Sequence, residues 1–185
     1  MSHPCRPLKP DFRGLRVRRR EPAGVCAGTL FPVTEPGIRI AGPADAPALA
    51  GLRRAWTAEQ YDLADDEGFE TRFGDWYERE SARRVTWLAE VSGEPAGMMN
   101  LAVFERMPRP GLDPGAWGYL GNAFVLAAYR DQGIGSRLLR ALLSYADDHG
   151  YVRVVLSPSQ RSVPFYQRFG FGAGSGLLVR PRPQR

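Results

Sequence analysis

The sequence predicts one domain of mixed α/β class, and three observations support this prediction. Apolar segments typical of strands occur at residues 38–40, 85–91, 97–105, 118–126 and 152–156. Other segments repeat apolar residues at helical spacing, near residues 43–56, 69–77 and 134–146. A chain of 185 residues with 43% hydrophobic residues is long enough for one core and too short for two comfortable ones.

The net charge of +5 lies at the two ends of the chain. Residues 1–36 hold seven Lys or Arg and three acids, and residues 180–185 add three Arg, which leaves −2 for residues 37–179. This balance does not favour nucleic acid as a partner of the folded part. Residues 1–36 also lack periodicity and are rich in Pro, Gly and Arg. We therefore predict a disordered basic extension at 1–36, a single domain at 37–179 and a short basic tail at 180–185.

Several classes of function lack the residues that they need. Cys5 and Cys26 show neither metal-ligand nor disulfide spacing, so we expect no metal. His149 ends a predicted helix, which leaves a Ser-His-Asp site without a convincing base. No apolar run approaches the roughly 18 residues of a membrane span, and the N-terminal stretch is too broken by Glu, Pro and Gly for a signal peptide. We expect a cytoplasmic protein without a membrane partner.

The first half of the domain is predicted as a strand, two helices and a hairpin. A strand at 38–40 precedes a helix that begins near Pro43 and buries Leu49, Leu52 and Trp56. A second helix follows from the helical spacing of Phe69, Phe73, Trp76 and Tyr77. Residues 85–91 and 97–105 are predicted to form an antiparallel hairpin around a turn at 92–95. The Pro-rich segment 107–115 is expected to be a loop that borders the substrate cleft.

The segment from Val125 to Leu139 joins a strand to a helix through a Gly-rich loop. Gly133 and Gly135 allow positive φ angles, so that successive N–H groups can point at an anion. The helix that starts near Ile134 adds its N-terminal dipole, and Arg130 offers forked donors to a diphosphate. An ordinary strand-to-helix turn that needs glycine for geometry alone is the alternative. No Walker A motif is present, and Leu138 replaces the third glycine of GxGxxG, so a nicotinamide cofactor is not expected.

The remaining elements follow from their end signals. The helix from Ile134 carries an apolar stripe and ends at His149 and Gly150. A strand at 152–156 comes next, and 177–179 is predicted as a last strand. Interior glycines in the strand 118–126 favour a bulge or a close backbone approach.

Two motifs resemble the GNAT acetyltransferase superfamily. Arg130, Gly133 and Gly135 fit its signature Arg/Gln-x-x-Gly-x-Gly/Ala, and residues 162–171 resemble its closing helix, often written LYEKLGF. The resemblance covers about residues 38–179. It implies a central, mostly antiparallel sheet with one V-shaped opening and helices on both faces. It also implies direct transfer of an acetyl group from acetyl-CoA to an amine.

The resemblance further implies a role for each residue of a candidate site. Arg130 and the amides from Asp131 to Ser136 would hold the diphosphate, and the backbone at Phe124 and Val125 would bind the pantetheine arm. Ser159 stands where many relatives carry an Asn that contacts the cofactor, which leaves that contact open. The cofactor-binding set is Phe124, Val125, Arg130, Asp131, Gln132, Gly133, Ile134, Gly135, Ser136 and Ser159.

Tyr166 matches the family's catalytic tyrosine by position. A phenol with a pKa near 10 can share a proton with a departing thiolate. The structural alternative is a partly buried helix tyrosine bonded to a carbonyl. The general base is not identified, because the strand before the signature offers Gly121 and Asn122, and this leaves Glu90, Glu105 or an ordered water.

The acceptor is defined only by class. In the resembling family, residues 59–80 correspond to the wall of the acceptor pocket, and here they hold nine acids and two arginines. These acids either attract a cationic amine or form a solvated helix face. We expect an N-acetyltransferase that acts on a small amine in a ternary complex. The alternatives are a protein or peptide N-acetyltransferase and a non-catalytic acyl-CoA-binding module, and the sequence leaves a homodimer open.

Overall fold

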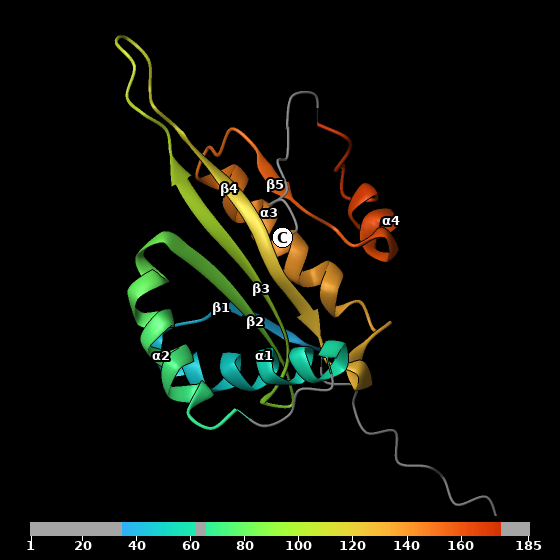
Figure 1. Ribbon diagram of the computed structural model, residues 1–185. Helices are drawn as coiled ribbons and strands as arrows, with labels where there is room; N and C mark the ends of the chain where they lie inside the picture. Colours follow the sequence, from blue (N-terminus) through green and yellow to red (C-terminus); the bar gives the residue numbers. More distant parts are fainter. Residues whose placement is uncertain (1–34, 62–65, 175–185) are drawn as a thin grey trace, which may run out of the picture. The chain divides into compact units, whose positions relative to one another are not determined.

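The computed structural model describes residues 35–61 and 66–174, which belong to one compact unit of the chain. These residues form a five-stranded sheet in the order β1-β2-β3-β4-β5, with helices packed on it (Figure 1). The predicted extension before residue 35, the strand at 177–179 and the tail at 180–185 lie outside the described residues.

Four antiparallel strands and one parallel strand make up the sheet. They are β1 (Gly37–Ile40), β2 (Arg84–Val91), β3 (Glu94–Glu105), β4 (Ala116–Val125) and β5 (Val154–Leu156). β5 pairs parallel to β4, whereas the other neighbours pair antiparallel. The predicted mixed α/β class with a mostly antiparallel sheet is confirmed.

The β2–β3 hairpin is tighter than the sequence predicts. Its turn consists of Ser92 and Gly93, which both take positive φ angles, 53° and 84°. Two such residues form the two-residue loop that matches strand twist. Glu94 and Pro95 therefore belong to β3 rather than to the predicted turn.

β4 pairs with β5 only at its beginning. The pairs run from Gly118↔Val154 to Leu120↔Leu156, and β4 then continues to Val125 without β5. At the same point β4 carries a bulge, because Asn100 pairs with Gly121 while Met98 pairs with Phe124. Asn122 in the bulge has a φ of +50°, as the interior glycine nearby led us to expect. The edge of β4 beyond Leu120 is thus not paired by β5, which agrees with the V-shaped opening that the resemblance implies.

Helices cover both faces of the sheet. α1 (Ala46–Tyr61), entered through a 3₁₀ turn at Pro43–Asp45, and α2 (Phe69–Glu80) lie on one face. α3 (Ile134–Asp148) lies on the other, as Figure 1 shows. Neighbouring strand residues point to opposite faces, so Met98 packs with α1 and Met99 packs with α3. The two cores are thus separated by the sheet.

The C-terminal elements are shorter than predicted. The closing helix α4 spans Val163–Gln167 after a 3₁₀ turn at Gln160–Ser162, instead of the whole of 162–171. The N–H groups of Phe169 and Phe171 both donate to the carbonyl of Tyr166, and Gly170 takes a φ of +84°. These bonds end the helix and turn Phe169 and Phe171 back onto the core.

Candidate functional site

The Gly-rich loop leads from β4 into α3 as predicted, but its two glycines play different parts. Gly133 takes a φ of +80° and precedes the helix, and Asp131 takes +60°. Gly135 lies inside the first turn of α3, without a positive φ, and a Cβ there would lie 3.7 Å from the ring of Phe165. The prediction of left-handed backbone is therefore right for Gly133 and wrong for Gly135.

The start of α3 offers backbone donors without acceptors inside the helix. Arg137 N–H makes the first bond of the helix, to the carbonyl of Gly133, at 3.0 Å. The amides of Ile134, Gly135 and Ser136 precede it, and no side chain of the described residues caps this end. Such donors and the positive end of the helix dipole suit an anion. The side chain of Ile134 is buried in the core, so only its backbone is available.

Arg130 stands at the loop entrance, but it is already engaged. Its Nε donates to the carbonyl of Val125 at 3.0 Å, and its Nη2 forms an ion pair with Glu59 at the end of α1. The guanidinium also lies over the ring of Phe124, at 5.7 Å from its centroid. A diphosphate bound by Arg130 would therefore compete with Glu59.

The free edge of β4 presents one of the two predicted backbone donors. The N–H of Leu126 donates to the carbonyl of Ala96 on β3. Because N–H directions alternate along a strand, the amide of Phe124 also faces β3 and that of Val125 faces the opening. The side chain of Phe124 is buried and stacks on Trp56 at 5.8 Å. The structure thus separates Phe124, a core residue, from Val125, a residue of the open edge.

Tyr166 on α4 is 8% exposed and lies against the core beneath α3. Its ring makes edge contacts with Phe165 and Phe171, and burial raises the pKa of its hydroxyl. The hydroxyl has no hydrogen-bond partner among the described residues, so the carbonyl-bonded alternative is not what the structure has. A neutral phenol with its proton unshared is what a proton donor needs.

Ser159 and Gln132 are exposed residues that stabilise turns. Ser159 Oγ lies 3.0 Å from Ser162 Oγ before α4, and Gln132 Nε2 donates to the carbonyl of Ala128 at 3.0 Å. Each keeps further hydrogen-bonding capacity, because Gln132 has a second N–H and its side-chain carbonyl, and the Ser159 hydroxyl has one partner.

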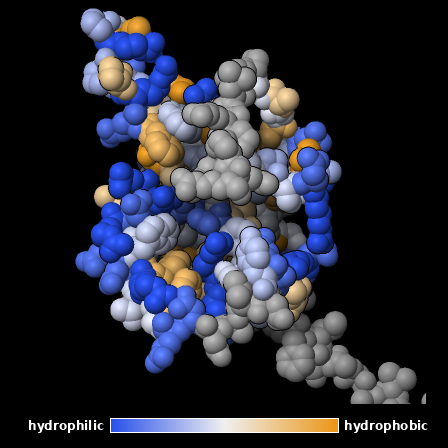
Figure 2. All heavy atoms as spheres, in the orientation of Figure 1, coloured by the Kyte–Doolittle hydropathy of each residue, from blue (hydrophilic) through white to orange (hydrophobic). Residues whose placement is uncertain are grey.

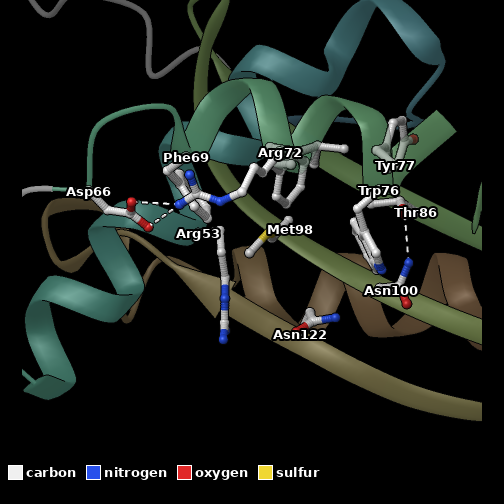
Figure 3. A pocket seen from close by; sticks show the side chains of 12 residues that line it. Arg53, Asp66, Phe69, Arg72, Trp76, Tyr77, Thr86, Met98, Asn100 and Asn122 are labelled. Carbon is white, nitrogen blue, oxygen red and sulfur yellow. Dashed lines mark hydrogen bonds and ion pairs between the residues drawn. The ribbon is translucent and has the colours of Figure 1, made fainter. Parts of the chain in front are cut away.

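A pocket of about 430 Å³ lies between α1, α2 and the strands β2 to β4 (Figure 3). Aromatic side chains of α2 form one wall, and Leu49 and Met98 lie beside them; the aromatic residues are Phe69, Phe73, Trp76 and Tyr77. On the face seen in Figure 2, hydrophobic atoms are exposed in a hollow beside α2, among hydrophilic residues. The Pro-rich loop 107–115, expected to border the cleft, joins the far ends of β3 and β4 and contributes no lining residue.

The sheet contributes uncharged polar side chains to the pocket. Asn100 is buried and donates to the hydroxyl of Thr86 at 2.7 Å, while Arg84 donates to its carbonyl at 3.3 Å. Asn122, in the β4 bulge, also lines the pocket. Sequence reasoning missed Asn100 as a site residue, although a polar residue inside an apolar strand is a usable signal.

Of the two alternatives left open for the acids of residues 59–80, the described part favours a solvated helix face over an acidic pocket wall. Asp66 is the only one of the described acids in that stretch to line the pocket, and it is ion-paired with Arg72. Glu70 pairs with Arg54, Glu80 with Arg84 and Glu59 with Arg130; Asp62 and Asp65 lie outside the described residues. Four of the seven described acids are thus ion-paired, and three of these four pair with arginines from outside the stretch.

The candidate bases lie away from the pocket. Glu90 is bound by Arg39 at 2.8 Å, and neither Glu90 nor Glu105 lines the pocket. Arg53, which the sequence analysis did not single out, does line it. Its position next to the core residue Leu52 on α1 was the available signal.

The described residues contain neither a candidate metal site nor a helix that could cross a membrane. No group of three or more His, Cys, Asp or Glu side chains there could hold a metal ion. In the same residues, no helix has the length and apolar character needed to cross a membrane.

Comparison with known proteins gives matches to acetyltransferases. The family model described as "Acetyltransferase (GNAT) family" matches residues 49–171. A glucosamine 6-phosphate N-acetyltransferase of Trypanosoma brucei brucei is 30% identical over 84 residues, which are 45% of this chain and 55% of that protein. The match thus spans about half the length of this curated relative.

Solved structures share the fold at low identity. A predicted acetyltransferase from Clostridium acetobutylicum, solved with acetyl-CoA, is 19% identical with a TM-score of 0.63, over 79% of this chain and 96% of that one. An aminoglycoside acetyltransferase from an uncultured soil metagenomic sample, solved with sisomicin, is 15% identical with a TM-score of 0.63, over 81% and 96%.

Proposed function

The chain belongs to the acetyltransferase (GNAT) family, and from this premise we propose that it transfers an acetyl group from acetyl-CoA to the primary amine of a small acceptor in a ternary complex. One observation supports the proposal above the others. The open edge of β4 at Val125 leads into the uncapped amides at the start of α3. Asn122, three residues before Val125 in the bulge of β4, lines the pocket. A cofactor site and an acceptor site therefore share β4.

Three features of the chain suit the diphosphate and the pantetheine arm. The amides of Ile134 to Ser136 and the guanidinium of Arg130 would hold the diphosphate. Nothing lies within 4 Å of the Cβ position of Gly133, so a ligand can approach this backbone closely. The amide of Val125 at the opening would donate to the pantetheine arm. Asp131 and Gln132 would contribute backbone rather than side chains.

In the transfer, the amine nitrogen would attack the carbonyl carbon of the acetyl-CoA thioester. A C–N bond then forms and the C–S bond breaks. The amine nitrogen loses one proton, and the departing sulfur gains one. We assign the second proton to Tyr166, because burial of the residue raises the pKa of its hydroxyl, which therefore keeps its proton at neutral pH. The described pocket lining holds no unpaired carboxylate and no histidine, which favours solvent as the acceptor of the first proton.

The pocket supports a small acceptor and direct transfer. Its volume of about 430 Å³ falls in the range typical of small-molecule sites, which favours a small amine over a peptide. The described lining residues include no Cys, Ser or Lys that could carry the acetyl group, and the Thr86 hydroxyl is held by Asn100.

Calorimetric titration with acetyl-CoA tests the cofactor site, with Ser136→Asp and Ser136→Asn as a matched pair. Asp at the third position of α3 stabilises the helix start but repels a diphosphate, whereas Asn has the same shape without the charge. We expect Ser136→Asp to weaken binding at least about tenfold and Ser136→Asn to bind nearly as wild type. Equal binding by both variants would overturn the proposed diphosphate site.

Release of free thiol with a panel of amines then tests transfer. Wild-type protein that binds acetyl-CoA and releases thiol with at least one amine supports the enzyme. Binding without thiol release from any amine would favour the non-catalytic acyl-CoA-binding module.

A further inference from the structure

Charge inside the acceptor pocket is biased towards positive. Among the described residues, three charged side chains line it, Arg53, Arg72 and Asp66. Asp66 makes a two-point contact with Arg72, so these two charges compensate each other. Arg53 is left as the excess charge, which disfavours a polycationic acceptor.

Arg53 is held in place without using its hydrogen-bond donors. Its guanidinium lies over the ring of Trp56 at 4.5 Å, and Trp56 in turn stacks on the buried ring of Phe124. No carboxylate of the described residues is paired with Arg53. Stacking on an aromatic ring fixes a guanidinium while its N–H groups stay available for an anion.

The side chain of Arg53 extends towards the part of the pocket beside β4, where the acetyl transfer would take place. Figure 3 shows Arg53 extending from α1 towards the strand that carries Asn122, below the aromatic side chains of α2. Asn122 sits in the bulge of β4, next to the point where β5 leaves β4. An anionic group bound by Arg53 would therefore lie close to the reacting amine.

We propose that the acceptor is a small amine that also carries an anionic group and an apolar body, as a large apolar α-amino acid does, and that Arg53 binds the anionic group. The apolar body would lie against Phe69, Phe73 and Trp76, and the amine would face the bulge. This inference rests on the transferase function proposed above and specifies its acceptor. Arg53 is then the residue that determines specificity.

The kinetic test compares phenylalanine, phenethylamine, glucosamine 6-phosphate and spermidine as acceptors. Phenethylamine keeps the amine and the ring of phenylalanine but lacks its carboxylate. Arg53→Met removes the charge and keeps an apolar stem, and Arg79→Met is the matched control, since Arg79 is exposed on α2 outside the pocket. Ratios of variant to wild-type kcat/KM for each amine cancel the different basicities of the amines.

We expect Arg53→Met to lower kcat/KM for phenylalanine about tenfold to 100-fold and to leave phenethylamine within about twofold. Arg79→Met should leave both unchanged. Equal losses for both amines, or a preference of the wild type for spermidine, would overturn the inference. A preference for glucosamine 6-phosphate over phenylalanine that depends on Arg53 would overturn the inference that the acceptor has an apolar body.

A binding measurement separates this inference from the proposed function. Calorimetric titration of phenylalanine into protein saturated with CoA needs no turnover. Binding that Arg53→Met loses and Arg79→Met keeps supports the inference even if no amine releases thiol, in which case only the transferase function fails. If other amines cause release of CoA thiol from acetyl-CoA but phenylalanine shows no Arg53-dependent binding, the proposed function stands and the inference fails.

Discussion

Arg130 links two parts of the site through one guanidinium. It is bonded to the carbonyl of Val125 at the open edge of β4 and to Glu59 at the end of α1. Both members of this ion pair are 37% exposed, so the pair contributes at most about 1 kcal/mol, and a diphosphate can replace Glu59. Cofactor binding would then release the end of α1, the helix that supplies Arg53 to the pocket.

Replacing Tyr166 with Phe tests the proton donor. We expect kcat to fall about 100-fold or more, with acetyl-CoA affinity unchanged, because only the departing sulfur needs the hydroxyl. Burial raises the pKa of Tyr166 above its ordinary value, so the group stays protonated at neutral pH and its titration should cause no loss of wild-type activity there.

The measurements are kcat from pH 6 to 10 and calorimetry with acetyl-CoA. Tyr151→Phe is the control, since burial also raises the pKa of Tyr151, which lies outside the candidate site. Undiminished kcat in Tyr166→Phe would leave Tyr166 as a core residue only.

Among the elements, β3 and β4 lie so close together at Gly97 that a side chain there would meet the backbone of β4. A Cβ on Gly97 would lie 2.8 Å from the backbone carbonyl oxygen of Phe124, which cannot move without shifting β4. We expect Gly97→Ala to lower the free energy of unfolding by about 1–3 kcal/mol and to weaken acetyl-CoA binding through Val125. Chemical denaturation and calorimetry measure these effects.

Gly121→Ala is the matched substitution on the other strand of this pair. Its Cβ would meet only the ring of Tyr119, at 3.5 Å, which is an ordinary contact. We expect its free energy of unfolding to stay within about 0.5 kcal/mol of wild type. A Gly97→Ala variant as stable as Gly121→Ala would show that β4 yields easily at this point.

The entrance to α1 depends on Asp45. Its carboxylate accepts from the amide of Gly42 at 2.7 Å and from Arg39 in two bonds of 2.7 Å, and these donors lower its pKa to about 2. Asp45→Asn should lower the free energy of unfolding by about 1 kcal/mol at pH 7.

The pH dependence of this effect has a definite sign. The folded pKa lies below the unfolded value of about 3.9, so the stabilisation is present above about pH 4 and is lost as the pH falls towards 2. Denaturation curves of wild type and Asp45→Asn should therefore converge over that interval. Asp75→Asn, an exposed acid on α2, serves as the control. A difference that persists unchanged at low pH would refute the linkage.

Sequence periodicity predicts the elements well where burial repeats regularly, as in α3 with its fully buried Leu138, Leu139 and Leu142. It fails where the chain ends an element through backbone bonds, as the carbonyl of Tyr166 does for α4. The loop of the cofactor site is local in sequence and could be located from its glycines.

The pocket could not be predicted in the same way, because its character depends on pairs from distant segments. Glu59 meets Arg130 and Glu70 meets Arg54. A count of charges along residues 59–80 therefore could not decide between an acidic wall and a solvated helix face, whereas the fold leaves Arg53 as the excess charge among the described lining residues.

At the scale of the whole domain, β4 contributes to both proposed sites, the cofactor site and the acceptor pocket. The loop at its end leads to the start of α3 on one face, and Asn122 lines the pocket beneath α1 and α2 on the other. The opening between β4 and β5 is the route by which an acetyl group would reach the pocket. The proposed function thus has both substrates bound at once, without a carrier side chain between them.

This arrangement predicts sequential kinetics. Initial rates measured against acetyl-CoA at several fixed amine concentrations should give double-reciprocal lines that intersect, because both substrates must be present before the C–N bond forms. Protein incubated with acetyl-CoA alone should show no stable acetylated side chain by mass spectrometry. Parallel lines, together with an acetylated residue that passes its acetyl group to the amine, would instead require a nucleophile in the path between the two sites. The described lining of the pocket offers two hydroxyls for that role, and both are engaged: Asn100 donates to that of Thr86, and that of Tyr77 donates to the carbonyl of Ala41.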